Sequence, residues 1–406
     1  MSVELQIDLS KEYGIVLEGG GARGSYQIGA WKALREAGLK IKGVAGASVG
    51  ALNGALICMD DYEKALEIWE NITYSQIMDV DDGLMENLMQ KDLKAISLTD
   101  LLSNMKRVWK EKGFDITPLR NLIDHVVDEE KIRSSDRELY VTTLSITDRQ
   151  ELKVDVKTAP EGTIPDILLA SAYFPAFKNE KLDGKRYMDG GGLNNVPVDI
   201  LLEHDYKHIL VIRIYGLGFD SEKVTKIPED VEVYHIAPRQ DLGGILEFDK
   251  KRSRRNITLG YYDAQRFLYG LAGKWYYIDA PGEESFYFNL LMTQAEEWKE
   301  YLAESVDEHM EPLHGYRAYV EEFFPRLAKT WKLNEEWDYR DLYIAILEDT
   351  AKRLRIKRFE IYTVETLLEK IREAWKQREL VSAEDRSRVG VQGDSDSDTD
   401  EEIFGE

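Results

Sequence analysis

A serine flanked by glycines, in the segment GASVG at Gly46–Gly50, fits the G-x-S-x-G pattern of a nucleophile elbow. In such an elbow the serine lies in a strained turn between a strand and a helix, and the glycines keep Cβ atoms out of the crowded turn. Ser48 would then present its hydroxyl for nucleophilic attack, and the backbone N–H of Val49 would stabilise the negative charge that develops. The pattern alone is also compatible with a plain tight turn.

A second glycine cluster lies earlier, in EGGGARGSYQIG at residues 18–29. Its spacing, Gly19-x-Gly21-x-x-Gly24, also fits the dinucleotide-binding fingerprint. That alternative requires an acidic residue at the end of the next strand, and the segment IKGVAGAS contains none. An oxyanion hole needs only backbone N–H groups, which glycines allow to approach closely. We therefore favour an oxyanion loop over a dinucleotide site.

These two motifs follow neighbouring elements of a strand–helix alternation. Residues 13–17, YGIVL, and 41–48, IKGVAGAS, are predicted as buried strands, and residues 25–37 and 49–59 as the helices that follow them. Both motifs would then lie at the carboxyl ends of adjacent parallel strands, where ligands bind. We expect them to face one pocket.

A serine nucleophile also needs a proton acceptor. None of the six histidines lies in a motif that indicates catalysis: His125, His204, His208, His235, His309 and His314. The other candidate is Asp189, in YMDGGGLNNVP, at the end of a short predicted strand. A free aspartate has a pKa near ~3.9, so burial would have to raise its proton affinity before it could act as a base.

Taken together, these segments resemble the patatin-like phospholipases, a family of serine lipid acyl hydrolases. GGGARG is similar to the family's oxyanion motif, GASVG to its nucleophile motif, and DGG at Asp189–Gly191 to its dyad motif. ASAYFPAF at residues 170–177, with Asn194 and Pro197, adds to the similarity, which extends over residues 13–238.

This resemblance implies that Ser48 is the nucleophile and Asp189 the base of a two-residue dyad that uses no cofactor and no metal. Arg23 would lie beside the oxyanion hole, where it could hold a substrate phosphate or support the loop. The further site residues implied are Gly19, Gly20, Gly21, Arg23, Gly24 and Val49 around the oxyanion, Gly46 and Gly50 at the elbow, and Gly190 and Gly191 beside the base.

The predicted fold is α/β, with three layers, α/β/α, around a mostly parallel central sheet, as in the patatin-like family, and a C-terminal helical region. We expect a catalytic domain at residues 1–280 with a helical insertion at about 84–110, which would either cap the pocket or pack on the sheet. Helices should fill residues 283–380, after a boundary near Pro281. Residues 383–406 are predicted to be an acidic disordered tail.

The charge and the cysteine content of the chain limit the kinds of partner and the location that we expect. The net charge of −23 argues against nucleic-acid binding and against strong adsorption to anionic membranes, so any lipid contact must use a local patch. Basic clusters at 250–255 and 352–358 either contact headgroups or pair with glutamates. The single cysteine, Cys58, and the lack of a leader or a long apolar stretch favour a cytoplasmic protein, and a local patch could give it peripheral contact with a membrane.

The expected function is that of a hydrolase of phospholipase A, lysophospholipase or esterase type, which cleaves carboxylic esters of phospholipids or lysophospholipids through an acyl-enzyme. Two alternatives remain open at this point. The same dyad could transfer the acyl group to an alcohol, as an acyltransferase or transacylase does. The chain could also be a regulated interaction module whose helical half dominates its biology. The sequence indicates no oligomeric state.

Overall fold

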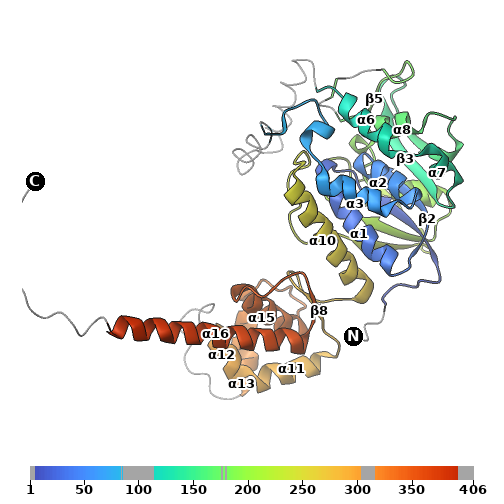
Figure 1. The fold of residues 1–406 in the computed structure, drawn as a ribbon. Coiled ribbons are helices and arrows are strands. Elements are labelled where there is room, and N and C mark those ends of the chain that lie inside the picture. The colour runs from blue at the N-terminus through green and yellow to red at the C-terminus, as the bar shows by residue number, and fades with distance from the viewer. Residues whose placement is uncertain are drawn as a thin grey trace, which may run out of the picture. The chain divides into compact units, whose positions relative to one another are not determined.

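The computed structural model describes residues 5–83, 85, 114–174, 177–178, 181–302 and 316–391. The chain divides into a first unit, Met1–Gly270, and a second unit, Leu271–Glu406 (Figure 1). The division precedes the expected boundary near Pro281, because residues 277–279 pair with a strand of the second unit. The insertion expected at about 84–110 lies outside the described residues apart from Met85.

A seven-stranded sheet forms the centre of the first unit, in the order β4-β3-β2-β1-β6-β7, with β5 also paired to β3. The parallel strands are β1 (Glu12–Leu17), β2 (Lys40–Ala47), β3 (Glu138–Ser145), β6 (His208–Ile212) and β7 (Glu232–Ile236). Two strands run antiparallel to β3: β4 (Gln150–Asp155) and β5 (Tyr187–Asp189). β1 lies between β2 and β6, and its apolar run is buried, as expected for a central parallel strand.

Helices cover both faces of this sheet. α9 (Val198–Glu203) packs on one face, where Val16, Ala45 and Ile209 share a core cluster with it. On the opposite face α2 (Val49–Cys58) approaches Val44 closely. The other helices are α1 (Ser25–Glu36), α3 (Tyr62–Asn71), α6 (Thr117–Val126), α7 (Glu129–Ser134), α8 (Ile164–Ser171) and α10 (Lys250–Tyr269) (Figure 1). The predicted α/β fold with a mostly parallel central sheet is confirmed.

α10 contains the first basic cluster and packs along α1. It begins at Asp249, whose carboxylate accepts the N–H of Arg252, and it ends at Gly270 in the left-handed conformation. Arg254 and Arg255 donate to backbone carbonyls of Glu70 and Asp241. These two cations therefore tie the helix to neighbouring loops.

The second unit is mainly helical. Its elements are β8 (Tyr277–Asp279), α11 (Glu284–Thr293), α12 (Ala295–Leu302), α13 (Tyr316–Ala318), the π-turn at Tyr319–Phe323, α14 (Phe324–Thr330), α15 (Tyr339–Arg353), β9 (Ile361–Thr363) and α16 (Val364–Val391). Trp298, Phe324 and Tyr343 lie in its buried core. α16 extends past Ala383, where the disordered tail was expected to begin, because the residues there include helix-favouring Ala, Glu and Arg. The rest of the tail, residues 392–406, lies outside the described residues.

No helix in the described ranges combines the length and the apolar character needed to cross a membrane.

Candidate active site

Ser48 lies in the turn between β2 and α2, with φ of 53° and ψ of −125°. A non-glycine residue at positive φ is strained, and such strain often occurs at functional positions. The flanking glycines are required by contact: a Cβ at Gly50 would lie 2.2 Å from the carbonyl oxygen of Leu17, and one at Gly46 would lie 2.4 Å from the carbonyl carbon of Gly50. The sequence pattern therefore corresponds to a tight strand–helix elbow.

Ser171, at the end of α8, supports this elbow. The backbone N–H of Ser48 donates to Ser171 Oγ at 2.9 Å, and Ser171 Oγ donates to the carbonyl oxygen of Thr142 at 2.7 Å. Ser171 is fully buried. The sequence analysis missed this residue, although it belongs to the ASAYFPAF segment that contributed to the family resemblance.

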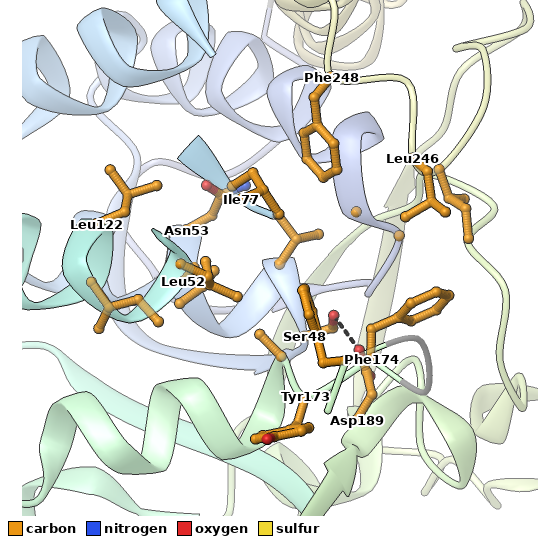
Figure 2. Close-up of a pocket in the computed structure, with 18 of the residues that line it drawn as sticks. Ser48, Leu52, Asn53, Ile77, Leu122, Tyr173, Phe174, Asp189, Leu246 and Phe248 are labelled. Carbon is orange, nitrogen blue, oxygen red and sulfur yellow. Dashed lines mark hydrogen bonds between the residues drawn. The ribbon is translucent and has the colours of Figure 1, made fainter. Parts of the chain in front are cut away.

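Asp189 ends β5 and lies directly beside Ser48 (Figure 2). Ser48 Oγ donates to Asp189 Oδ2 at 2.6 Å, and the N–H of Gly191 donates to Asp189 Oδ1 at 2.8 Å. Burial raises the pKa of Asp189 from 3.8 to about 6, although the hydrogen bonds from Ser48 and Gly191 oppose that rise. The carboxyl group is thus held at the serine hydroxyl with a proton affinity well above that of a free aspartate.

The glycine loop lies on the other side of Ser48. Gly20, Gly21, Ser48 and Val49 line one cavity. In the part of the chain that the structure describes, the backbone N–H groups of Gly20, Gly21 and Val49 have no protein acceptor. Gly24 packs against Val49, where a Cβ would come within 2.5 Å of the valine side chain. Unpaired N–H groups beside a serine hydroxyl are suited to binding an oxyanion.

Arg23 supports the loop from behind. Its Nε donates to the carbonyl oxygen of Gly243 at 2.7 Å, and its Nη1 donates to the carbonyl oxygens of Ile214, at 3.4 Å, and Tyr215. Arg23 is not among the residues that line the cavity. Of the two roles considered for it, support of the loop is the one that these contacts favour.

Glu18 is a buried carboxylate that the sequence analysis did not select. Its Oε2 accepts the backbone N–H groups of Ile214 at 2.7 Å and Tyr215 at 3.0 Å, and also Nε of Arg213 at 3.0 Å. Its Oε1 accepts the N–H of Gly216 at 3.2 Å. Glu18 thereby fixes residues 213–216 against the strand from which the glycine loop begins. A charged residue directly after a buried strand was the available signal.

Asn195 closes the same corner of the site. Its Nδ2 donates to the carbonyl oxygen of Gly19 at 3.1 Å, and the N–H of Gly19 donates back to the carbonyl oxygen of Asn195 at 3.2 Å. Asn195 also lines the cavity. The segment that follows Asp189 is therefore bonded directly to the glycine loop.

The cavity at Ser48 has a volume of about 610 Å³, within the range of small-molecule sites. Figure 2 shows Leu52, Ile77 and Leu122 on one side of Ser48 and Phe174 and Leu246 on the other. Apolar side chains from α2, α3 and α6, together with Ile77 from the turn at residues 74–77, form one wall of the cavity: Leu52, Leu56, Trp69, Ile77, Leu122 and Ile123. The hydrogen-bonded pair of Ser48 and Asp189 therefore opens onto an apolar chamber.

Comparison with known proteins agrees with the motifs. Residues 15–202 match the model of the family described as patatin-like phospholipase. Patatin-like phospholipase domain-containing protein 7 of Rattus norvegicus is 28% identical over 200 residues, which cover 49% of this chain and 13% of that protein. Neuropathy target esterase sws of Drosophila melanogaster is 28% identical over 201 residues, which cover 50% of this chain and 13% of that protein.

Among solved structures, the crystal structure of VipD from Legionella pneumophila aligns over 89% of this chain and 87% of that chain, with a TM-score of 0.40 and 14% identity. The curated relatives are much longer than the region that they share with this chain, which spans only about an eighth of their length. The matched residues include strands β2 to β5, the elbow at Ser48 and the glycine loop. Residues 15–202 therefore match a patatin-like phospholipase domain.

Proposed function

We propose that the first unit is a serine acyl hydrolase that cleaves carboxylic ester bonds of phospholipids or lysophospholipids. The observation that carries this proposal is the 2.6 Å hydrogen bond from Ser48 Oγ to Asp189 Oδ2 at the edge of an apolar cavity. A nucleophile needs an adjacent proton acceptor, and Asp189 is the carboxylate in contact with this hydroxyl. The family description and the esterase name of the Drosophila relative support ester chemistry.

In the first step Ser48 Oγ forms a bond to the ester carbonyl carbon, and its proton passes to Asp189 Oδ2. The carbonyl oxygen becomes an oxyanion, which the N–H groups of Gly20, Gly21 and Val49 are suited to stabilise. The tetrahedral intermediate then expels the alcohol, and the proton on Asp189 moves to the leaving oxygen. The acyl group remains as an ester on Ser48.

Water completes the reaction. Asp189 takes a proton from the attacking water, whose oxygen bonds to the acyl carbon. Collapse of the second tetrahedral intermediate breaks the bond to Ser48 Oγ, which recovers its proton from Asp189. The products are a fatty acid and the alcohol portion of the lipid.

The apolar lining of the cavity favours a substrate whose acyl chain lies deepest in it. Its wall along α2, α3 and α6 is apolar, and burial of each methylene contributes about 0.8 kcal/mol. The ester would lie at Ser48, and the polar headgroup would remain outside the chamber. This orientation leaves the alcohol portion of the lipid less constrained than the acyl chain.

The buried free thiol of Cys58 fits a reducing compartment. We therefore place the enzyme on the cytoplasmic side of a membrane surface, where it would meet its lipid from the aqueous phase. Fractionation of cells, with and without a high-salt wash, would test this location.

The test uses purified Ser48→Ala and Asp189→Asn variants with Ser10→Ala, an exposed serine of the same unit, as the control. Turnover of p-nitrophenyl butyrate should fall by at least ~10³-fold in the first two variants and remain unchanged in the control. A fluorophosphonate probe should label the wild type at Ser48. Full activity in either dyad variant would remove that residue from the mechanism.

Product analysis separates the hydrolase from a transacylase. The enzyme is incubated with a phospholipid and an excess of lysophospholipid acceptor, and the lipids are identified by mass spectrometry. Free fatty acid as the dominant product supports hydrolysis. Transfer of the acyl chain from the phospholipid to the lysophospholipid acceptor would favour a transacylase.

A further inference from the structure

We propose that the mouth of the cavity is surrounded by an apolar rim that docks on a zwitterionic phospholipid surface. This inference rests on the proposed function, because a lipid hydrolase must take its substrate from such a surface. We define the apolar rim as Ile146, Leu193, Tyr215, Phe219 and Val224. In the described part of the first unit these five are the large hydrophobic side chains that are strongly exposed, from 39% for Ile146 to 71% for Val224.

The rim comes from three loops, and backbone hydrogen bonds join two of them. The N–H of Phe219 donates to the carbonyl oxygen of Gly191 at 3.0 Å, and the N–H of Asn195 donates to the carbonyl oxygen of Phe219 at 3.0 Å. These bonds hold the loop that contains Phe219 beside the loop that contains Leu193. Scattered exposed hydrophobic residues need no explanation, but exposed apolar residues gathered on adjoining loops mark an interaction surface.

This surface is continuous with the cavity. Ile146 belongs both to the rim and to the cavity lining. Gly192 and Gly218 also line the cavity, and each is the chain neighbour of an exposed rim residue, Leu193 or Phe219. A lipid that leaves a surface in contact with the rim would therefore enter the cavity without crossing water. Continuity with the proposed acyl site favours lipid over a protein partner.

Charge selects the kind of lipid surface. The turns at residues 146–149 and 181–187 together contain four Lys or Arg and two Asp, a local excess of two positive charges in a chain of net charge −23. Two of these cations, Arg149 and Arg186, are exposed and form no ion pair with any carboxylate that the structure describes. They suit the phosphates of phospholipid headgroups, whereas the acidic remainder of the chain disfavours a strongly anionic membrane. A zwitterionic surface satisfies both conditions.

The experiment measures sedimentation with phosphatidylcholine vesicles. All proteins carry Ser48→Ala, so that the lipid stays intact. The rim variant Leu193→Ser/Phe219→Ser, whose two sites lie outside the cavity lining, should lower the vesicle partition coefficient by ~10-fold or more. Val224→Ser alone should give a smaller loss. The matched control is Phe286→Ser/Leu380→Ser, which removes two exposed apolar side chains of the second unit and should leave partition unchanged.

A second measurement separates this inference from the proposed function. For this measurement the rim variant keeps Ser48. It should hydrolyse soluble p-nitrophenyl butyrate at the wild-type rate, and that result would also show that it is folded. An enzyme without esterase activity that still binds vesicles through the rim would refute the function and leave the docking surface intact. An active enzyme whose vesicle binding is unchanged by the rim substitutions would refute the docking surface alone.

Ionic strength provides the last discrimination. Binding through apolar burial should persist in 0.5 M NaCl, because salt screens charges and does not weaken apolar contact. Binding that requires anionic lipid and disappears in salt would overturn the proposal and point to basic residues such as those at 250–255. Self-association that depends on the rim, without vesicle binding, would show that a second copy of the chain occupies this surface.

Discussion

Replacing Asp189 with asparagine should stabilise the first unit at neutral pH while it abolishes turnover. Burial raises the pKa of Asp189 from 3.8 to about 6, so between these pH values the folded protein binds more protons than the unfolded chain. The stability that this protonation provides is fully present below pH 3.8 and is lost as the pH rises through about 6. Two units of pKa correspond to about 3 kcal/mol at pH 8. Asparagine has no charge to bury, and its amide oxygen can still accept the N–H of Gly191.

The assay measures the free energy of unfolding between pH 4 and pH 8 by urea denaturation. Unfolding is monitored by hydrogen exchange in peptides of β1 and β2, which report on the first unit. The difference between Asp189→Asn and the wild type should grow by about 2–3 kcal/mol over this range. Asp115→Asn is the control, because hydrogen bonds from Thr117 hold the pKa of Asp115 at about 2, and its difference should stay constant from pH 5 to pH 8. A constant difference for Asp189→Asn would refute the raised pKa and the account of Asp189 as a base near neutral pH.

Three other substitutions test the support of the site. Glu18→Gln should cost about 2 kcal/mol in unfolding free energy and lower kcat for p-nitrophenyl butyrate, because charged hydrogen bonds to Arg213 and the 214–216 backbone are lost; unchanged kcat would show that the glycine loop does not need this anchor. Gly50→Ala should lower Tm and prevent fluorophosphonate labelling, since its Cβ would meet the carbonyl oxygen of Leu17 at 2.2 Å. Leu122→Trp should lower kcat/KM for long-chain esters by ~10-fold relative to short-chain esters, and an equal effect on both would contradict an acyl chain in the deep chamber.

Local patterns in the sequence were sufficient to predict the elements that contain the site. The run YGIVL predicts a buried strand, GASVG predicts the turn after the next strand, and the structure places Ser48 in that turn at positive φ. Glycine is informative here because steric contact excludes any other residue at Gly50. Asp189 was selected because a serine nucleophile needs a proton acceptor and because DGG resembles the dyad motif of the patatin-like family; Asp-Gly-Gly alone is most often a turn.

Contacts between segments that are far apart in the sequence could not be predicted from local patterns. Glu18 binds residues 213–216, and Ser171 binds the backbone of Ser48, across separations that no periodic pattern marks. α10 was hidden because its first residues, KKRSRR, resemble a solvated charged segment, whereas the helix they begin packs along α1. The start of the second unit at Leu271 was hidden because it depends on the pairing of β8 with β9, which are far apart in the sequence.

The distance between Ser48 and Asp189 is set by a strand that supplies neither residue. In β3, Thr142 is in register with Ala47, the residue before Ser48, and Thr143 is in register with Asp189. Because a one-residue slip in pairing turns side chains to the opposite face of a sheet, either pairing in the wrong register would separate hydroxyl from carboxylate. The carbonyl oxygen of Thr142 also accepts Ser171 Oγ, which in turn accepts the backbone N–H of Ser48. β3 therefore aligns the side chains of Ser48 and Asp189 through backbone pairing, and we expect substitutions that disturb its register to reduce activity without contact with the substrate.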